Sequence, residues 1–476
     1  MDTSAATGKM HAPGSGGVPE KRPVPGGEKR MTKLLHGNEK NSLNGGREPL
    51  FSQKELLVLA IPLLVEQLLE VTVGMADTMM VSRCGEAAIS GVSLVDMINN
   101  LIIVLFAALA TGGAVGQYLG AKEQEKANAS AGQLILLSAV LGAVVAALCI
   151  LFARPMISAC YGSIDADVLD AGVLYLKITA LSYPFLALYN AGAALFRSMG
   201  NSKISMQISV LMNIINIVGN AVCIFGLKMG VDGVAWPSVV SRVIAAVLIL
   251  GRCYQKGHAL TVPKTVKLDT GMAKRILGIG VPSAFENSLF EAGRIVVVSM
   301  ISTFGTVQIA ANAVANNLDG VGCIPGKAIG LAMITVVGRC VGAQQLDQAS
   351  YFTKKLLLWD YIAQGATNAL ILIFLNPLLS VYTLSDETRH LAWLLVMIHA
   401  GSAIFLWPAG FVLPNALRAA NDVRFTMLTS ILSMGIWRLA FSYILCVQMG
   451  MGAVGVWIAM VVDWVCRVTC FVVRFV

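Results

Sequence analysis

The chain contains few charged residues. Only 13% of its 476 residues are Asp, Glu, Lys or Arg, about half of the ~25% that is usual in soluble domains. A water-soluble fold of this length could not cover its surface with so few charges. Hydrophobic residues make up 56% of the chain. The composition therefore excludes an ordinary soluble protein and favours one that lies in a membrane.

The motifs of common enzymes are missing as well. Gly326-Lys327 faintly resembles a phosphate-binding loop, but Ala328 stands where that loop needs a hydroxyl. Cys466 and Cys470 are four residues apart, yet no second pair or histidine completes a zinc site. The sequence predicts no enzyme, no ATP site and no cofactor, so uphill transport would need an ion gradient or a separate subunit.

Long apolar runs fill most of the chain. Helices of roughly 18–25 residues cross about 30 Å of hydrocarbon, and about twelve runs of that kind follow one another. They lie near 56–82, 90–115, 131–153, 168–195, 204–227, 234–252, 276–303, 308–336, 355–378, 388–413, 425–447 and 453–475.

The second half of the chain repeats the first with an offset of about 220 residues. VGQYLGA at 115–121 reappears as VGRCVGA at 337–343, and Glu66 matches Glu286. Each half has an even number of spans, so both halves cross the membrane in the same direction. We expect an all-α membrane protein with two six-helix lobes, related by a pseudo-two-fold axis along the membrane normal.

The domain organisation follows from the same pattern. Residues 1–50 are rich in Gly, Pro, Lys and Glu without an apolar run, which predicts a disordered tail and no signal peptide. The N-lobe should occupy 51–255, a linker 256–275 and the C-lobe 276–476.

Basic residues set the expected orientation. Loops on one side of the predicted spans carry about fifteen Lys and Arg, and loops on the other side about four. The positive-inside rule then places both termini in the cytoplasm. The net charge of +8 follows mainly from these loops and the tail, so no nucleic-acid partner is needed to explain it.

Three acids share one face of the first span. At 100° per residue Glu66, Glu70 and Asp77 fall on one stripe. Each charge in hydrocarbon costs about 2.5–3.5 kcal/mol. The acids should therefore face a wet cavity, or bind a cation or proton. The alternative is a structural ion pair with a base such as Arg294 or Arg242.

The seventh span carries two more acids. Glu286 and Glu291 are five residues apart, about 140° around the helix, so they point in different directions. Arg294 is three residues after Glu291 and could pair with it. We interpret Glu286 as the cavity acid. At the position of the second half that corresponds to Asp77, the chain has Val297. Binding of the coupling ion is therefore expected mainly in the first lobe.

Polar residues also occur in other spans. Asn213, Asn216 and Asn220 form a stripe on the fifth span. Their amides could coordinate a hard cation or join helices, and the sequence leaves both possibilities open. The sequence does not show which of four further acids at or near membrane depth are structural and which are functional: Asp96, Asp319, Asp360 and Asp463.

Several motifs together resemble the MATE (multidrug and toxic compound extrusion) family. They are ADTMMV at 76–81, VGQYLGA at 115–121, FRSMGN at 196–201, GVDGVA at 230–235 and GVW at 455–457. The resemblance covers residues 52–476. It implies two helical bundles around a central cavity, in a monomer of the plasma membrane. It also implies export of amphipathic drugs, often small organic cations, in exchange for Na⁺ or H⁺.

The resemblance also implies a coupling site in the N-lobe. The central first-span acid of prokaryotic members matches Asp77. An Asn and an acid on the fifth span, with a hydroxyl on the sixth, match Asn216, Asn220 and Ser238. Asn220 departs from the usual Asp and removes one charge. If the coupling ion is Na⁺ rather than H⁺, the resemblance places it at Asp77, Asn216 and Asn220.

A seventh-span Glu that matters in some branches matches Glu286 or Glu291, and the repeat favours Glu286. The functional hypothesis is a cation-coupled antiporter. Asp77 and its polar neighbours would bind Na⁺ or H⁺. Glu286 or Glu291, with Glu66, would contact a cationic substrate or carry a second proton.

Two other functions compete with this hypothesis. A flippase for lipid-linked precursors has a similar two-lobed plan, but its cavity should be basic, and we count more mid-span acids than clear mid-span bases. A non-transporting membrane scaffold would not need the duplicated plan with its buried acids.

Overall fold

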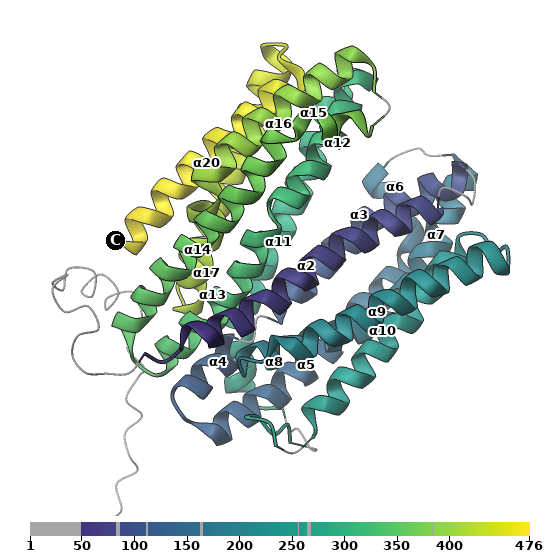
Figure 1. Cartoon of the computed structure of the whole chain (residues 1–476). Helices are drawn as coiled ribbons and strands as arrows, with labels where there is room; N and C mark the ends of the chain where they lie inside the picture. Colours follow the sequence, from purple (N-terminus) through teal and green to yellow (C-terminus); the bar gives the residue numbers. More distant parts are fainter. Residues whose placement is uncertain are drawn as a thin grey trace, which may run out of the picture.

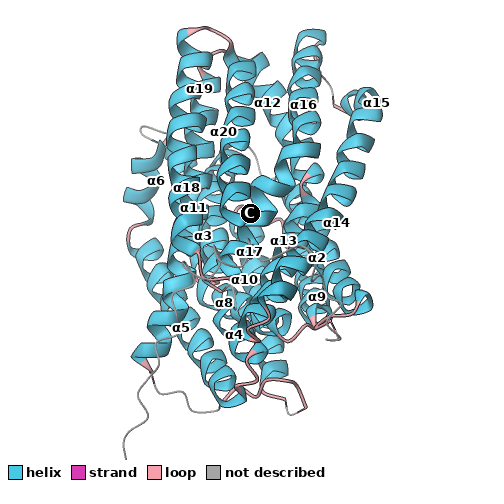
Figure 2. Cartoon of the chain, turned by 90° about the vertical axis from the view of Figure 1, so that its left-hand side faces the viewer, coloured by secondary structure: helices cyan, strands magenta, loops and turns pink. Residues whose placement is uncertain are grey.

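The computed structural model describes residues 49–81, 86–110, 113–161, 165–255, 257–263, 268–382 and 384–476, without the side chains of 74–79, 81 and 86–89. The predicted disordered tail lies almost entirely outside these residues. The described part is built of helices and contains no strand (Figure 2).

The described residues of the N-terminal half form ten helical segments. They are α2 (Gln53–Val81), α3 (Glu86–Leu109), α4 (Gly113–Gly120), α5 (Gln124–Leu151), α6 (Ala153–Tyr161), α7 (Ala166–Ala180), α8 (Tyr183–Ser198), α9 (Ser202–Ala221), the π-helix η2 (Val222–Gly226) and α10 (Asp232–Cys253).

The C-terminal half begins with α11, which starts six residues before the expected lobe boundary. Its segments are α11 (Thr270–Ser302), α12 (Thr306–Gly322), α13 (Ile324–Gly342), α14 (Leu346–Ile373), α15 (Leu375–Ser380), α16 (Asp386–Trp407), η3 (Pro408–Val412), α17 (Leu413–Ala419), α18 (Val423–Ser433), η4 (Met434–Ala440), α19 (Phe441–Tyr443), η5 (Ile444–Gln448) and α20 (Gly452–Phe475).

The helices account for the predicted spans. Ten segments of the described chain are long and apolar enough to cross a membrane, and α7 with α8, bent by 46°, makes eleven. The seventh predicted span is α11, which has 33 residues. It is long enough to cross, but polar residues such as Glu286 and Glu291 lower its mean hydropathy. The chain is therefore a multi-pass membrane protein.

The helices form two lobes, as the repeat predicts. Figure 1 shows α3 to α10 in one bundle and α11 to α20 in the other, with the ribbons diverging towards one end. At the opposite end, α4 of the first lobe packs against α13 of the second. We call this the closed end.

The closed end is built from the two copies of the repeated motif. A Cβ on Gly120 would lie 2.1 Å from the carbonyl oxygen of Arg339. A Cβ on Gly342 would lie 2.0 Å from the carbonyl oxygen of Gln117. Only glycine permits backbones to approach so closely. The matching glycines of the repeat therefore fix the point where the lobes cross.

Polar contacts tie the closed end together. Gln117 Nε2 donates to the carbonyl oxygen of Ala419 at 3.0 Å and to Asn421 Oδ1 at 2.9 Å. Gln117 Oε1 accepts from Arg275 Nη2 at 2.9 Å. Arg275 also donates to the hydroxyl of Tyr118 at 2.8 Å. One side chain of the first lobe thus holds both the start of α11 and the end of α17.

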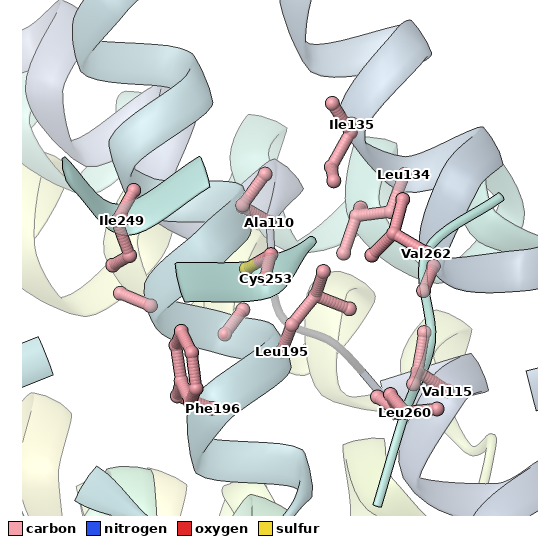
Figure 3. Close-up of a cluster of buried hydrophobic side chains, with 14 of the residues drawn as sticks. Ala110, Val115, Leu134, Ile135, Leu195, Phe196, Ile249, Cys253, Leu260 and Val262 are labelled. Atoms are coloured by element: carbon pink, nitrogen blue, oxygen red, sulfur yellow. The ribbon is translucent and has the colours of Figure 1, made fainter. Parts of the chain in front are cut away.

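A hydrophobic cluster anchors the linker between the lobes. Leu260 and Val262 are 2% and 4% exposed and insert among side chains of the first lobe (Figure 3). Leu134, Leu195 and Val115 surround them in the same cluster. The apolar contacts keep the connection between the lobes at the closed end.

Replacing Gly342 by alanine should disrupt the crossing of α4 and α13. The added methyl group would overlap the backbone at Gln117, so we expect destabilisation of about 1–3 kcal/mol. The purified Gly342→Ala variant in detergent should therefore have a lower melting temperature than the wild-type protein. Gly338→Ala on the same helix is the control, because its Cβ would meet nothing within 4 Å. Equal melting temperatures for the two variants would contradict the close approach.

Candidate functional site

The asparagine stripe of α9 faces α10, as required for the predicted N-lobe site. Asn213, Asn216 and Asn220 are 9%, 7% and 0% exposed. Asn216 Nδ2 donates to Ser238 Oγ at 2.9 Å, and Asn220 Nδ2 donates to Asn216 Oδ1 at 3.4 Å. Their spacing places all three on one helix face. The structure therefore brings Asn216, Asn220 and Ser238 together inside the first lobe.

These residues offer oxygen ligands of the kind that hard cations prefer. The amide and hydroxyl oxygens are neutral, so a bound cation would also need a carboxylate. Asp77 belongs to α2, which packs against α9. The side chain of Asp77 lies outside the described residues, and its role stays a prediction.

Glu66 and Glu70 have different surroundings although they are one helical turn apart. Glu66 is partly buried, and its Oε1 accepts a hydrogen bond from the Tyr189 hydroxyl at 3.2 Å. Its Oε2 is buried and has no hydrogen-bond partner among the described residues. Glu70 is exposed. Glu66 has no ion pair with Arg242, which instead donates to Ser182 Oγ at 2.7 Å.

Glu286 forms an ion pair inside the second lobe. It is 6% exposed, and its Oε1 accepts from Arg418 Nη2 at 2.6 Å and from the Ser430 hydroxyl. The predicted contact with a cationic substrate would require this pair to open. The predicted pair of Glu291 with Arg294 is present at 3.6 Å and is more exposed.

Three of the four further acids, Asp96, Asp463 and Asp319, have clear polar partners among the described residues. Asp96 is exposed on α3 and accepts from the Tyr175 hydroxyl at 3.1 Å. Asp463 is fully buried on α20, where Arg467 Nε donates to its Oδ1 at 3.0 Å. The Ser433 hydroxyl donates to the same oxygen. Asp463 is therefore a structural anchor of the second lobe.

Asp319 joins α12 to α16. Its Oδ1 lies 2.7 Å from His399 Nε2 and accepts from Cys323 Sγ at 3.0 Å. The three ligand atoms lie within 4.8 Å of one another, a mixed donor set that suits a borderline divalent metal. The hydrogen bond from Cys323 and the contact with His399 already satisfy the carboxylate.

Asp360 is isolated. It is 0% exposed, and neither carboxylate oxygen has a hydrogen-bond partner among the described residues. Gln364 and Asn368 continue the same face of α14 and are 0% and 1% exposed. An unpaired charge in such surroundings is very costly. The carboxyl group is therefore stable only when it carries a proton or holds a cation.

The sequence reasoning missed the basic side of these contacts. No motif or spacing in the sequence points to His399, Arg438 or Arg467, and Arg418 lies between the spans predicted at 388–413 and 425–447, among the basic residues of the predicted loops. Each lies within a helix of the second lobe, so charged residues inside apolar spans were the available signal. The sequence suggests more acids than bases within the spans, but in the second lobe the helices carry basic residues beside these acids.

Glu286→Gln should destabilise the second lobe. It would leave the guanidinium of Arg418, whose side chain is 16% exposed, without a countercharge, and loss of one partner of a buried pair costs up to about 3–5 kcal/mol. We expect a lower melting temperature than for the wild type. Glu291→Gln is the control, since its loosely paired side chain is more exposed. If Glu286→Gln and Glu291→Gln have the same melting temperature, the pair of Glu286 with Arg418 contributes little to the stability of the second lobe.

Comparison with known proteins agrees with this architecture. The MatE family model matches residues 62–222 and 282–444, one match in each lobe. An uncharacterised transporter of Bacillus subtilis, YisQ, is 30% identical over 436 residues, which cover 88% of this chain and 93% of that protein. A probable multidrug resistance protein of Thermotoga maritima, NorM, is 24% identical and covers 88% and 90%.

Solved structures share the fold. An outward-facing multidrug resistance MATE transporter superposes with a TM-score of 0.82 at 20% identity, covering 88% of this chain and 94% of that one. At this identity the likeness concerns the fold. With the family model matching both halves and relatives along most of the chain, the protein belongs to the MatE family of multidrug transporters and is not an enzyme.

Proposed function

We propose that the protein is an antiporter that exports amphipathic organic compounds, including organic cations, in exchange for H⁺ or Na⁺. The observation that carries this proposal is the presence, in each lobe, of a carboxyl group without a cationic partner. Glu66 Oε2 and both oxygens of Asp360 are buried without hydrogen-bond partners among the described residues. Carboxyl groups in apolar surroundings are stable when protonated or bound to a cation.

The N-lobe would hold the main coupling site. Asn216 and Ser238 are already in contact at 2.9 Å, and Asn220 follows one turn later. Asp77 on the neighbouring helix would supply the negative charge. Binding or release of one cation changes the charge of the lobe, so it shifts the balance between conformations with different affinities for substrate.

The two arrangements of the lobes follow from the closed end. The loops that flank α4 and α13 are on the basic side of the sequence, so this end would face the cytoplasm, together with both termini. The described arrangement is then open to the outside of the plasma membrane. The opposite arrangement requires separation of Gly120 and Gly342 at the crossing.

The exposed acid Asp96 supports cationic substrates. It lies on α3, which packs against α11 of the other lobe, so it is close to the region between the lobes. A carboxylate there would attract an organic cation, and the adjoining apolar helices would accept its rings.

Asp77→Asn should abolish gradient-driven efflux while leaving the protein folded. The variant cannot bind or release the coupling cation, so ethidium efflux from proteoliposomes should fall at least about tenfold, to the rate without a gradient. Asp360→Asn should reduce it as well if the second lobe also takes up a proton. Asp347→Asn, exposed on the same helix as Asp360, is the control. Full efflux by well-expressed Asp77→Asn would refute the coupling site.

A further inference from the structure

Three metal-ligating side chains of different kinds converge between α12 and α16. Asp319 Oδ1 lies 2.7 Å from His399 Nε2 and 3.0 Å from Cys323 Sγ, and the three ligand atoms all lie within 4.8 Å of one another. Asp319 and Cys323 are four residues apart, so both project from one face at the end of α12. His399 belongs to α16, which packs against α12. Two adjacent helices thus supply a carboxylate, a thiol and an imidazole at one point.

The orientation of the histidine ring is that of a metal ligand. His399 is 2% exposed, and its Nε2 makes no hydrogen bond with the described residues, although Asp319 Oδ1 is only 2.7 Å away. At so short a distance the direction of the ring nitrogen is at fault, because a hydrogen bond requires the N–H to point at its acceptor. Two ligand atoms that lie close together without pointing at each other can both point at a third atom between them.

The surroundings fix the ring and leave one ligand accessible. Trp457 and Trp464 of α20 pack edge-on against His399, with ring centroids 5.6 and 5.1 Å away. The indole N–H of Trp457 donates to Asn312 Oδ1 at 2.9 Å, which holds that ring in place. Asp319 has 24% of its side chain exposed, so an ion and a water ligand have a route to the carboxylate. Apolar walls of this kind tune a metal site, and an entry path is a requirement of one.

The charges of the three ligands match those of a divalent cation. A carboxylate and a thiolate carry two negative charges together, and a neutral imidazole adds none, so a bound dication leaves no net charge. This balance is important inside an apolar lobe, where an uncompensated charge is costly. Arg294 and Arg438 interact electrostatically with Asp319. A ligand set with fewer negative charges would therefore hold a cation poorly at this place.

We propose that Asp319, Cys323 and His399 form a binding site for a divalent transition-metal ion, Zn²⁺ in the first instance, with water as the fourth ligand. Sulfur, nitrogen and oxygen donors in one site favour Zn²⁺ over hard cations such as Na⁺ or Mg²⁺. Neighbouring ligand atoms of a tetrahedral Zn²⁺ site lie roughly 3.3–3.7 Å apart, so Asp319 Oδ1 has to move from its two neighbours by only about half an ångström.

Metal binding would replace the hydrogen bond within the cluster. Cys323 Sγ now donates its proton to the carboxylate of Asp319. Zn²⁺ would take the place of that proton, which leaves to solvent as the thiolate forms. Coordinate bonds would then tie α12 to α16. The site is independent of the proposed export function, because it requires neither a gradient nor a transported compound.

Zinc binding to the purified full-length protein in detergent tests the site. After treatment with EDTA and removal of the chelator, the wild-type protein should retain about one equivalent of added Zn²⁺ through desalting. Cys323→Ser and His399→Gln should each lower the affinity for Zn²⁺ by at least about 100-fold, because loss even of a residue that only supports a ligand costs about 10–100-fold. Competition with a zinc-binding dye measures these affinities.

Substitution of Co²⁺ for Zn²⁺ identifies the sulfur ligand. A bond between Co²⁺ and a thiolate produces a charge-transfer absorption in the near ultraviolet. This band should appear in the wild-type protein and be absent from Cys323→Ser. Cys446→Ser is the matched control, because Cys446 is a fully buried cysteine of the same lobe outside the cluster. Its replacement should change neither the band nor the affinity for Zn²⁺.

Melting temperatures provide a second readout and show whether each variant folds without metal. Zn²⁺ should stabilise the wild type and Cys446→Ser, since a ligand that binds only the folded state stabilises it, but neither Cys323→Ser nor His399→Gln. Zinc binding that is equal in the wild type and in both cluster variants would show an adventitious ion only and overturn the proposal. A wild-type protein without bound Zn²⁺ or without the Co²⁺ band would overturn it too, as would equal stabilisation by Mg²⁺.

Discussion

A charge inside an apolar helical bundle must be compensated, and the polar architecture of both lobes depends on this constraint. Water cannot stabilise an ion there, and isolated charges are expensive. The second lobe satisfies the requirement with the pairs Glu286–Arg418 and Asp463–Arg467. The first pair joins α11 to α17. The second lies within α20 and is hydrogen-bonded to Ser433 and to the carbonyl oxygen of Ser430 on α18. Asp360 has no such partner among the described residues, so a proton or a cation has to neutralise its charge.

The contact between the lobes at the closed end is the second main feature of the structure. At the closed end the two lobes meet in a contact that is close yet free of interlocking side chains. The repeated glycines provide it, because backbone meets backbone at Gly120 and Gly342. A few polar contacts around Gln117 then stabilise one arrangement. Duplication of one half explains why the crossing is nearly symmetric.

Features set by local sequence could be predicted. Length and apolar composition determine the spans, and the repeat determines the two lobes, which the structure confirms. The spacing on α9 predicts that Asn216 and Asn220 share one face, and the resemblance to the family adds Ser238, which the structure places in contact with Asn216. The pair of Glu291 with Arg294 lies within one helical turn.

Contacts between distant helices were not predictable in this way. Glu286 and Arg418 are 132 residues apart, so only the packing of α11 against the last third of the chain brings them together. The isolation of Asp360 is also a property of tertiary structure, since it depends on the side chains that all neighbouring helices provide. Asp77 is identified by resemblance to the family, and its contacts lie outside the described residues.

Efflux of ethidium from proteoliposomes of the wild-type protein, under an imposed Na⁺ gradient and separately under an imposed pH gradient, tests gradient-coupled export most directly. The account predicts efflux against the ethidium gradient under at least one of the two, collapsing when an ionophore dissipates that gradient. Na⁺-driven efflux would locate coupling at Asp77 and the polar site of α9 and α10. Efflux driven by pH would assign it to protonation of carboxyl groups such as Glu66 and Asp360. Equal rates with and without either gradient, in correctly folded protein, would contradict the account.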